Sequence, residues 1–176
     1  SLDQRGDRMH IECEIPARGL IGLRSHMLTA TSGEAVMYHC FHKYAPVRTT
    51  LYRRANGVLI ATAPGQATTY AMLNISQRGV LFVEPQEVIY GGQIVGENSR
   101  DNDLEVNVVK GKAFSNVREA NKEATTVLKA SREITLESAL EYIQDDELVE
   151  ITPDNIRIRK TELSESKRKQ IARKNK

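Results

Sequence analysis

The chain has 176 residues and a formal net charge of +2, and 40% of its residues are hydrophobic and 27% charged. This balance is typical of a globular protein, and a chain of this length buries roughly two-thirds of its unfolded surface. Its two cysteines, Cys13 and Cys40, give neither a disulfide framework nor a paired metal-binding spacing, and no apolar run has the length of a membrane span. The composition therefore excludes a disulfide-rich scaffold and a transmembrane protein, and we expect a cytoplasmic protein with no membrane partner.

The charges are distributed unevenly along the chain. From residue 133 to residue 154 nearly every charged side chain is acidic, and from Arg157 to the end nearly every one is basic. A basic end of this kind often meets phosphate, although a solvated tail is the commoner explanation of a single charge run. The charge of the tail alone leaves both interpretations open.

The first predicted elements are a strand, a helix and a second strand. Residues 7–16 alternate between apolar and polar side chains, which predicts a half-buried strand that ends at Pro16. Residues 17–33 have helical spacing with Gly33 as the stop, and residues 34–47 form a β-rich run. We expect Cys13 and Cys40 to pack as small hydrophobic side chains in these strands. One helix on two strands is a thin unit, so we expect the chain to begin inside a domain.

From about residue 49 the pattern changes to short apolar runs separated by Gly-containing turns, which predicts short strands in a small barrel or sandwich. Residues 68–79 are consistent with a brief helix, and residues 85–97 with a strand, a tight turn and a strand. The segment 148–160 predicts two strands around a Pro-Asp-Asn turn. The segment from Ser164 onward has almost no large apolar residue, which predicts disorder or a solvated helix that orders on a partner.

A second helix is predicted after residue 134, because Thr135 is a suitable N-cap. The apolar side chains that follow have the spacing of one helical face, which predicts a buried stripe. The predicted stripe consists of Leu136, Ala139, Leu140 and Ile143.

No motif for nucleotide hydrolysis or metal binding is complete. A P-loop reading of residues 106–113 fails because Val106 replaces the first Gly and Ala113 occupies the Ser/Thr position. In a strand, His39 and His42 would point to opposite faces, which disfavours a shared metal. The acidic residues 145–147 are best interpreted as a solvated helix end, and residues 100–103 as a turn.

The segment 108–130 is long, basic and weakly patterned, and such an excursion from a folded domain is usually functional or disordered. Two lysines flank a flexible Gly, Ser and Asn side chains donate hydrogen bonds, and an Arg binds phosphate bidentately or stacks on a base. Phe114 offers a stacking face to an unstacked base. RNA binding and a mobile surface loop both remain open, and Phe114 is alternatively an anchor on the core.

Residues 15–47, "IPARGLIGLRSHMLTATSGEAVMYHCFHKYAPV", resemble the final elongation-factor-G-like domain of translational GTPases. The run Ala-Arg-Gly-Leu-Ile-Gly at residues 17–22 has the form found in the TypA/BipA family. The resemblance continues through residues 53–118 and resumes over residues 134–160, so it covers nearly the whole chain.

This resemblance implies an α+β fold in three parts. Residues 1–47 would be the later half of a ferredoxin-like domain, and residues 48–163 a family-specific, mostly β, barrel-like domain with a short helix and a long projecting loop. Residues 164–176 would be a basic flexible tail. The GTPase domain of the family, with its GTP and Mg, lies upstream, so this chain is expected to hold no cofactor and to be no enzyme by itself.

The resemblance also implies a ribosomal function: translation regulation, assembly of the large subunit and stress adaptation, with large-subunit rRNA and A-site tRNA as partners of a monomer. The family's loop residues map onto Lys110, Gly111, Lys112, Ser115, Asn116 and Arg118. Phe114 joins them on its chemistry alone, since the family usually has a smaller aliphatic residue there, and Ala113 replaces a common Lys.

Further basic side chains are candidates for additional phosphate contacts, namely Arg18, Arg24, Lys167, Arg168 and Lys169. The first two are alternatively solvated or paired with Glu12 or Glu14. As an alternative function, the acidic helix region 133–150 would recognise a ribosomal or stress-related protein.

Overall fold

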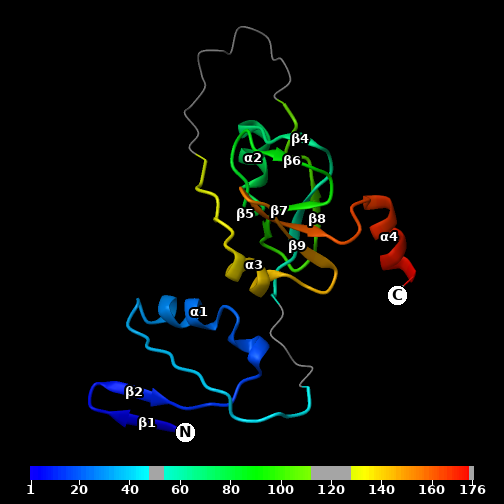
Figure 1. Cartoon of the computed structure of the whole chain (residues 1–176). Coiled ribbons are helices and arrows are strands. Elements are labelled where there is room, and N and C mark those ends of the chain that lie inside the picture. Colours follow the sequence, from blue (N-terminus) through cyan, green and yellow to red (C-terminus); the bar gives the residue numbers. More distant parts are fainter. Residues whose placement is uncertain (48–53, 112–127, 175–176) are drawn as a thin grey trace. The chain divides into compact units, whose positions relative to one another are not determined.

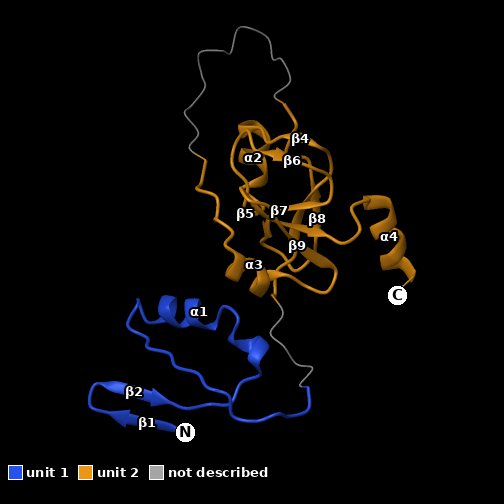
Figure 2. Ribbon diagram, in the orientation of Figure 1, with its two compact units in different colours: residues 1–53 blue, residues 54–176 orange. Residues whose placement is uncertain are grey.

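The computed structural model describes residues 1–47, 54–111 and 128–174. The chain divides into two units, residues 1–53 and residues 54–176, which Figure 2 shows in separate colours. Each unit has its own elements and is described by itself.

Unit 1 consists of a hairpin and a short helical segment. Strands β1 (Leu2–Arg5) and β2 (Arg8–Ile11) pair antiparallel, with Leu2 opposite Ile11. The helical segment begins as the 3-10 helix η1 (Ala17–Leu20) and continues as α1 (Leu23–Ala30). Gly22 has a φ of 74°, a left-handed conformation that separates the two helices. Gly33, with a φ of 93°, follows the end of α1 as predicted.

Unit 1 has almost no interior. Within residues 1–47 the only buried residue is Gly22. Large apolar side chains are exposed instead: Tyr38 is 91% exposed and Tyr44 is 95% exposed. Several predictions for this unit are therefore wrong: the strand at 7–16 is shorter and exposed throughout, residues 34–47 form no strand, and both cysteines are exposed. Alternation makes a strand half-buried only where a second layer covers its apolar face, and residues 1–47 provide none.

Unit 2 is built on one mixed sheet. Its strands are β3 (Val58–Ala61), β5 (Gly79–Leu81), β7 (Gln93–Asn98), β8 (Leu104–Val106), β9 (Glu147–Ile151) and β10 (Ile156–Lys160). They are ordered β8-β3-β7-β10-β9, with β5 also paired to β7. Strands β3 and β8 run parallel, and the other pairs are antiparallel. A separate small pair consists of β4 (Gly65–Gln66) and β6 (Val88–Ile89).

Two apolar clusters bury the central strands of this sheet. Leu59 and Ala61 of β3 join one cluster with helix α2 (Thr69–Ile75), whereas Val58 and Ile60 join the other with helix α3 (Leu136–Tyr142). A strand that contributes alternate residues to two clusters has no polar face, which explains why β3 is entirely apolar. Figure 1 shows both helices beside the sheet.

Several sequence predictions for unit 2 are confirmed. The α+β class is confirmed, and β9 and β10 form the predicted hairpin, in which Ile156 lies opposite Ile151. Thr135 caps α3 in a capping box with Ser138. The predicted stripe of α3 is confirmed only in part, since Ala139 is fully buried whereas Leu136 and Leu140 are 43% and 46% exposed.

The strand, turn and strand predicted at residues 85–97 are present as β6, Gly91–Gly92 and β7. The two strands do not pair with each other, since β6 pairs with β4 and β7 lies in the main sheet. The main sheet, as far as the structure describes it, is an open path of strands rather than a closed barrel. The basic end forms helix α4 (Glu165–Lys174), the helical of the two predicted alternatives.

Candidate nucleic-acid interface

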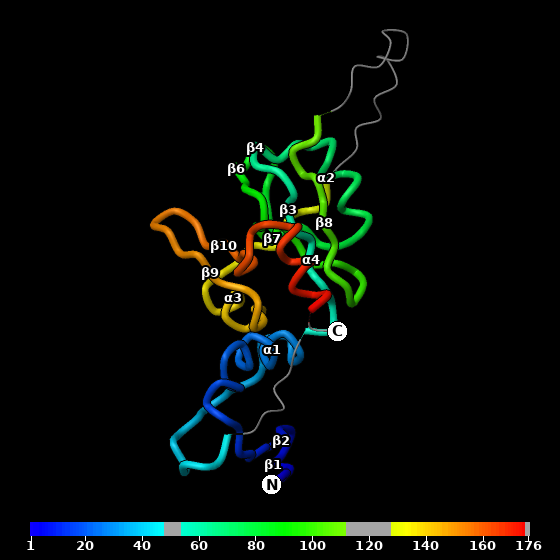
Figure 3. Tube along the Cα trace, turned by 90° about the vertical axis from the view of Figure 1, so that its right-hand side faces the viewer, coloured from blue at the N-terminus to red at the C-terminus, as the bar shows by residue number. Residues whose placement is uncertain are grey.

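The outgoing end of the basic excursion is fixed to unit 2 by Thr68. Val108 is only 1% exposed, and the Thr68 amide donates to its carbonyl at 2.9 Å. The Thr68 hydroxyl donates to the Lys110 carbonyl at 2.7 Å and accepts from the Ala71 amide at 3.2 Å as the N-cap of α2. One side chain therefore caps the helix and holds the first basic residue of the excursion. Figure 3 traces the backbone of this outgoing end next to α2.

The returning end is fixed by Leu128 and Arg132. Leu128 packs against the apolar cluster that contains α2. The Arg132 amide donates to the Leu81 carbonyl at 2.8 Å, and its guanidinium lies 4.8 Å from the Phe82 ring centre and pairs with Glu97 at 3.1 Å. Hydrogen bonding, cation–π attraction and charge pairing thus act on one residue. Both ends of the excursion, residues 108–111 and 128–132, are thus attached to unit 2, and we call these two ends its root.

The structure describes two of the predicted loop residues. Lys110 and Gly111 are exposed, and a side chain built on Gly111 would meet no atom within 4 Å. The other predicted loop residues, Lys112, Phe114, Ser115, Asn116 and Arg118, lie outside the described residues. The described part of the predicted site thus consists of the exposed Lys110 and Gly111 at the outgoing end of this root.

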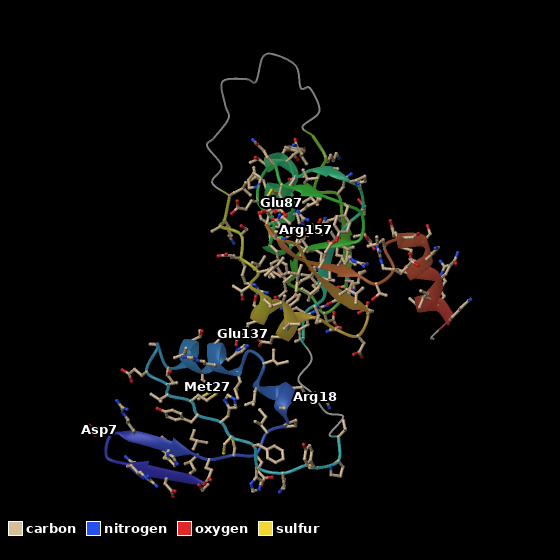
Figure 4. All side chains as sticks on the ribbon, viewed as in Figure 1. Asp7, Arg18, Met27, Glu87, Glu137 and Arg157 are labelled. Carbon is tan, nitrogen blue, oxygen red and sulfur yellow. The ribbon has the colours of Figure 1, made fainter. Side chains whose placement is uncertain are left out.

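The remaining predicted phosphate contacts belong to three different helices. Arg18 on η1, which Figure 4 labels, and Arg24 on α1 are both exposed. In the same unit Glu14 pairs with His42 and Lys43 at 3.0 Å. Lys167, Arg168 and Lys169 lie on α4 in unit 2.

The three basic side chains of α4 have different surroundings. Lys167 is 67% exposed, and Lys169 is 65% exposed and pairs with Glu165, whose pKa this hydrogen bond lowers. Arg168 is only 15% exposed and pairs with Glu105 at 2.5 Å. The geometry assigns Lys167 and Lys169 to the solvent and Arg168 to the body of the unit.

The sequence did not predict a buried charge cluster around Glu147. Glu147 is 3% exposed, and its carboxylate accepts from Arg54 at 2.7 and 2.5 Å and from Lys160 at 2.9 Å. Lys160 also pairs with Asp146 at 2.8 Å and with Asp103 at 2.7 Å. The prediction of a solvated helix end at 145–147 is therefore wrong for Glu147. The signal was the hairpin register, since Lys160 lies directly opposite Glu147.

The electrostatics of this cluster indicate a structural role. Burial by itself lowers the pKa of Lys160, but hydrogen bonds to Asp103 and Asp146 and the charge of Glu147 raise it above its ordinary value. The pKa of Arg54 is likewise raised, because pairing with Glu147 exceeds the opposing effect of burial. Each carboxylate faces a cation that stays charged, so the cluster offers no poised acid or base.

A weaker, half-buried pair joins Arg157 on β10 to Glu87, which precedes β6. Glu87 and Arg157 are 3.9 Å apart, and Figure 4 labels both side chains. The Arg157 Nε is buried and has no hydrogen-bond partner among the described residues. Among the described residues, no group of three or more His, Cys, Asp or Glu side chains is arranged to hold a metal ion. Across the same residues, no helix combines the length and apolarity needed to cross a bilayer.

Comparison with protein families divides the chain near the boundary of the two units. A model described as TypA/BipA C-terminal domain matches residues 56–165. A model described as elongation factor G C-terminus matches residues 1–55.

Curated relatives agree with these matches. The chain is 45% identical over 163 residues to the large ribosomal subunit assembly factor BipA of Bacillus subtilis (strain 168), covering 92% of this chain and 27% of the relative. Identity to the factor of the same name is 47% over 153 residues in Synechocystis sp., with coverage of 87% and 26%, and 44% over 167 residues in Escherichia coli (strain K12), with coverage of 94% and 28%. The chain thus spans about a quarter of the length of these relatives. The extent and identity of these matches place this chain in the TypA/BipA family, as a C-terminal part of such a protein.

Proposed function

We propose that this chain is the ribosome-binding C-terminal region of a translational GTPase that takes part in assembly of the large ribosomal subunit. The observation that carries the proposal is an exposed Lys110–Gly111 pair on a root that Thr68 fixes to α2. The name shared by the relatives, large ribosomal subunit assembly factor, supports the ribosome as partner. GTP and Mg belong to the GTPase domain of the full-length protein, and this chain contributes binding.

The proposed contacts are to large-subunit rRNA and to the acceptor end of A-site tRNA. The lysines on either side of Gly111 reach successive phosphates, and Arg118 binds phosphate or stacks on a base. Phe114 stacks on an unpaired base, and Ser115 and Asn116 donate to phosphate or sugar. A root fixed at both ends supports this role, because ordering the residues of the root costs no further entropy when RNA binds.

We also propose the division of the chain that the sequence suggested, with a ferredoxin-like remnant over residues 1–47 and the family-specific domain over residues 48–163. The lack of a core in residues 1–47 supports it, since half of a two-layer domain exposes the face that the other half covers. Cytoplasmic location, translation regulation and stress adaptation belong to the same proposal.

The proposal is tested by co-sedimentation with isolated large ribosomal subunits over a salt series. We expect the chain to pellet with the subunits and the triple variant K110A/K112A/R118A to remain largely in the supernatant. A matched control, R5A/R8A/R100A, removes three exposed cations outside the excursion and should pellet like the original chain. Circular dichroism verifies that all three proteins fold. Equal pelleting of the loop variant would refute the loop as the ribosome-binding element.

The alternative, recognition of a protein by the acidic region 133–150, is separated by competition. Two carboxylates of that region are already engaged, because Glu147 lies in the buried cluster and Glu150 accepts from the Tyr90 hydroxyl at 2.5 Å. Protein-free large-subunit rRNA should therefore displace the chain from subunits. Displacement by ribosomal proteins but not by rRNA would favour the acidic region.

A further inference from the structure

Helix α4 is a strongly basic helix with no apolar side to bury. Its ten residues contain five cations and one carboxylate, and none of them is buried. Ile171, its only large apolar residue, is 49% exposed. A helix that is polar on every side needs support other than a hydrophobic stripe. Figure 1 shows α4 beside the sheet of unit 2 and away from α2.

The support comes from Arg168. Its guanidinium donates to the Glu105 carboxylate at 2.5 Å and to the carbonyls of Glu162 and Leu163 at 2.7 Å each. Glu105 lies on β8, so this contact ties α4 to the edge strand of the main sheet. An Arg that satisfies one carboxylate and two carbonyls is held in one orientation, and the helix is held with it.

The preceding chain is fixed as well. Gly92 has a φ of 86°, and a side chain built on it would lie 2.8 Å from the Leu163 backbone. The Gly92 carbonyl accepts from the Lys160 amide at 3.0 Å. The segment that leads into α4 therefore packs directly against the turn before β7, which only Gly permits at this distance.

This anchoring determines which side of α4 faces outward. Arg168 points toward the sheet, where it pairs with Glu105, and Ile171, three residues on, shares its side of the helix but is 49% exposed. Lys167 and Lys174, seven apart, share a neighbouring side and are spaced by roughly 10 Å along the axis. Lys169 and Arg173, four apart, share another side. Four cations thus surround the outward part of a helix whose inward cation is already paired.

We infer that α4 is a second RNA-binding element, separate from the loop, whose Lys167, Lys169, Arg173 and Lys174 contact the phosphate backbone while the Arg168–Glu105 pair orients the helix. The inference rests on the proposed function, because it takes RNA as the partner. It assigns Arg168 as a positioning residue rather than a phosphate ligand.

The chemistry of the helix favours a polyphosphate partner. A cation array with no aromatic residue and only one large apolar residue, Ile171, has little to read a base or fill a protein pocket, but it neutralises successive phosphates. Two contacts compete, Lys167 with Glu162 at 3.9 Å and Lys169 with Glu165, and both lysines are largely exposed, so both pairs are weak. Binding should depend on salt and be indifferent to sequence.

The first experiment separates orientation from net charge. Binding of the whole chain to a short fluorescein-labelled RNA duplex is measured by fluorescence anisotropy for R168Q and for E105Q. Both variants break the same pair, but one removes a positive charge and the other a negative charge. If the pair orients α4, both weaken binding, by roughly threefold to tenfold. Tighter binding by E105Q with weaker binding by R168Q would show that only net charge matters and would overturn the inference.

The second experiment alters only exposed side chains, so it stays decisive even if E105Q disturbs the fold. The variant K167Q/R173Q/K174Q should lower the slope of log affinity against log salt by about 2, since each phosphate contact contributes about 0.7–0.9. The control R5Q/R8Q/R100Q removes the same charge and should leave the slope within about 0.5 of the original. An unchanged slope in the α4 variant would overturn the inference.

The loop variant K110A/K112A/R118A in the same assay distinguishes the two proposals. Loss of slope in the α4 variant alone supports α4 and refutes the loop, and loss in the loop variant alone does the reverse. Loss in both supports two elements, and loss in neither refutes both.

Discussion

Units 1 and 2 contain apolar residues of the same kinds, yet they use them differently. All the buried apolar residues in the described parts of the chain lie in unit 2, from Val58 to Ile158, whereas Val36, Tyr38 and Phe41 of unit 1 are 67%, 91% and 72% exposed. Unit 2 has helices that cover its sheet, and the described residues of unit 1 have a hairpin and a helix with no second layer. An apolar pattern therefore becomes a core only where another layer faces it.

The largest expected effect concerns the two units in isolation. Expressed alone, residues 54–176 should unfold cooperatively on heating, because both apolar clusters lie within this range. Residues 1–53 alone should show no cooperative transition. Thermal melts followed by circular dichroism make the comparison, and a sharp transition in residues 1–53 would contradict it.

The next effect concerns ion pairs. Replacing Glu147 by Ala should destabilise unit 2 by about 3–5 kcal/mol, because Arg54 and Lys160 would lose their buried counter-charge. The matched change in unit 1, Glu14→Ala, removes the exposed pairs with His42 and Lys43 and should change stability by less than about 1 kcal/mol. Urea titrations of the two variants measure both values, and similar values would refute the difference in burial.

The same comparison holds for one apolar side chain. Val95 is 0% exposed in β7, and its replacement by Ala should cost about 2–3 kcal/mol from lost burial and the cavity left behind. Val36 is 67% exposed, and Val36→Ala should change stability by less than about 0.5 kcal/mol. Chemical denaturation gives both numbers, and a cost of Val36→Ala as large as that of Val95→Ala would place a hidden core in unit 1.

The smallest effect is a pH dependence within unit 2. Burial and the hydrogen bond to Glu150 raise the pKa of Tyr90 from 10.0 to about 12. Because the folded-state pKa is raised, the protonated hydroxyl contributes stability that is complete below pH 10 and is lost as the pH rises toward 12.

Tyr90→Phe should therefore lower stability by about 1 kcal/mol at neutral pH and make little difference above pH 12. Urea titrations at the two pH values test this difference. Ultraviolet titration should show that Tyr90→Phe removes a tyrosinate step near pH 12, and its persistence would refute the assignment.

The elements that the sequence predicted well are those defined by neighbouring residues. Thr135 caps α3 through bonds to Ser138, three residues away. The β9–β10 hairpin closes through Thr152 and Asn155, whose mutual hydrogen bonds of 2.9–3.1 Å complete the turn. Lys110 and Gly111 are exposed, and their contact with RNA stays a prediction.

The features that the sequence did not predict depend on distant partners. Arg54 meets Glu147 across 93 positions of the chain, and β3 pairs in parallel with β8, where Leu59 lies beside Leu104. Neither Arg54 nor β8 carries a local signal for its partner, because long-range pairing follows from the packing of the whole sheet.

The family, the α+β class, the capped helix and the basic excursion follow from the sequence alone, since long motifs and short-range hydrogen bonds involve consecutive residues. The burial of Glu147, the pairing of Arg168 with Glu105 and the attachment of the excursion by Thr68 and Arg132 are known only from the tertiary structure. Burial and ion pairing depend on which segments the fold brings together, and no single segment encodes its distant partner.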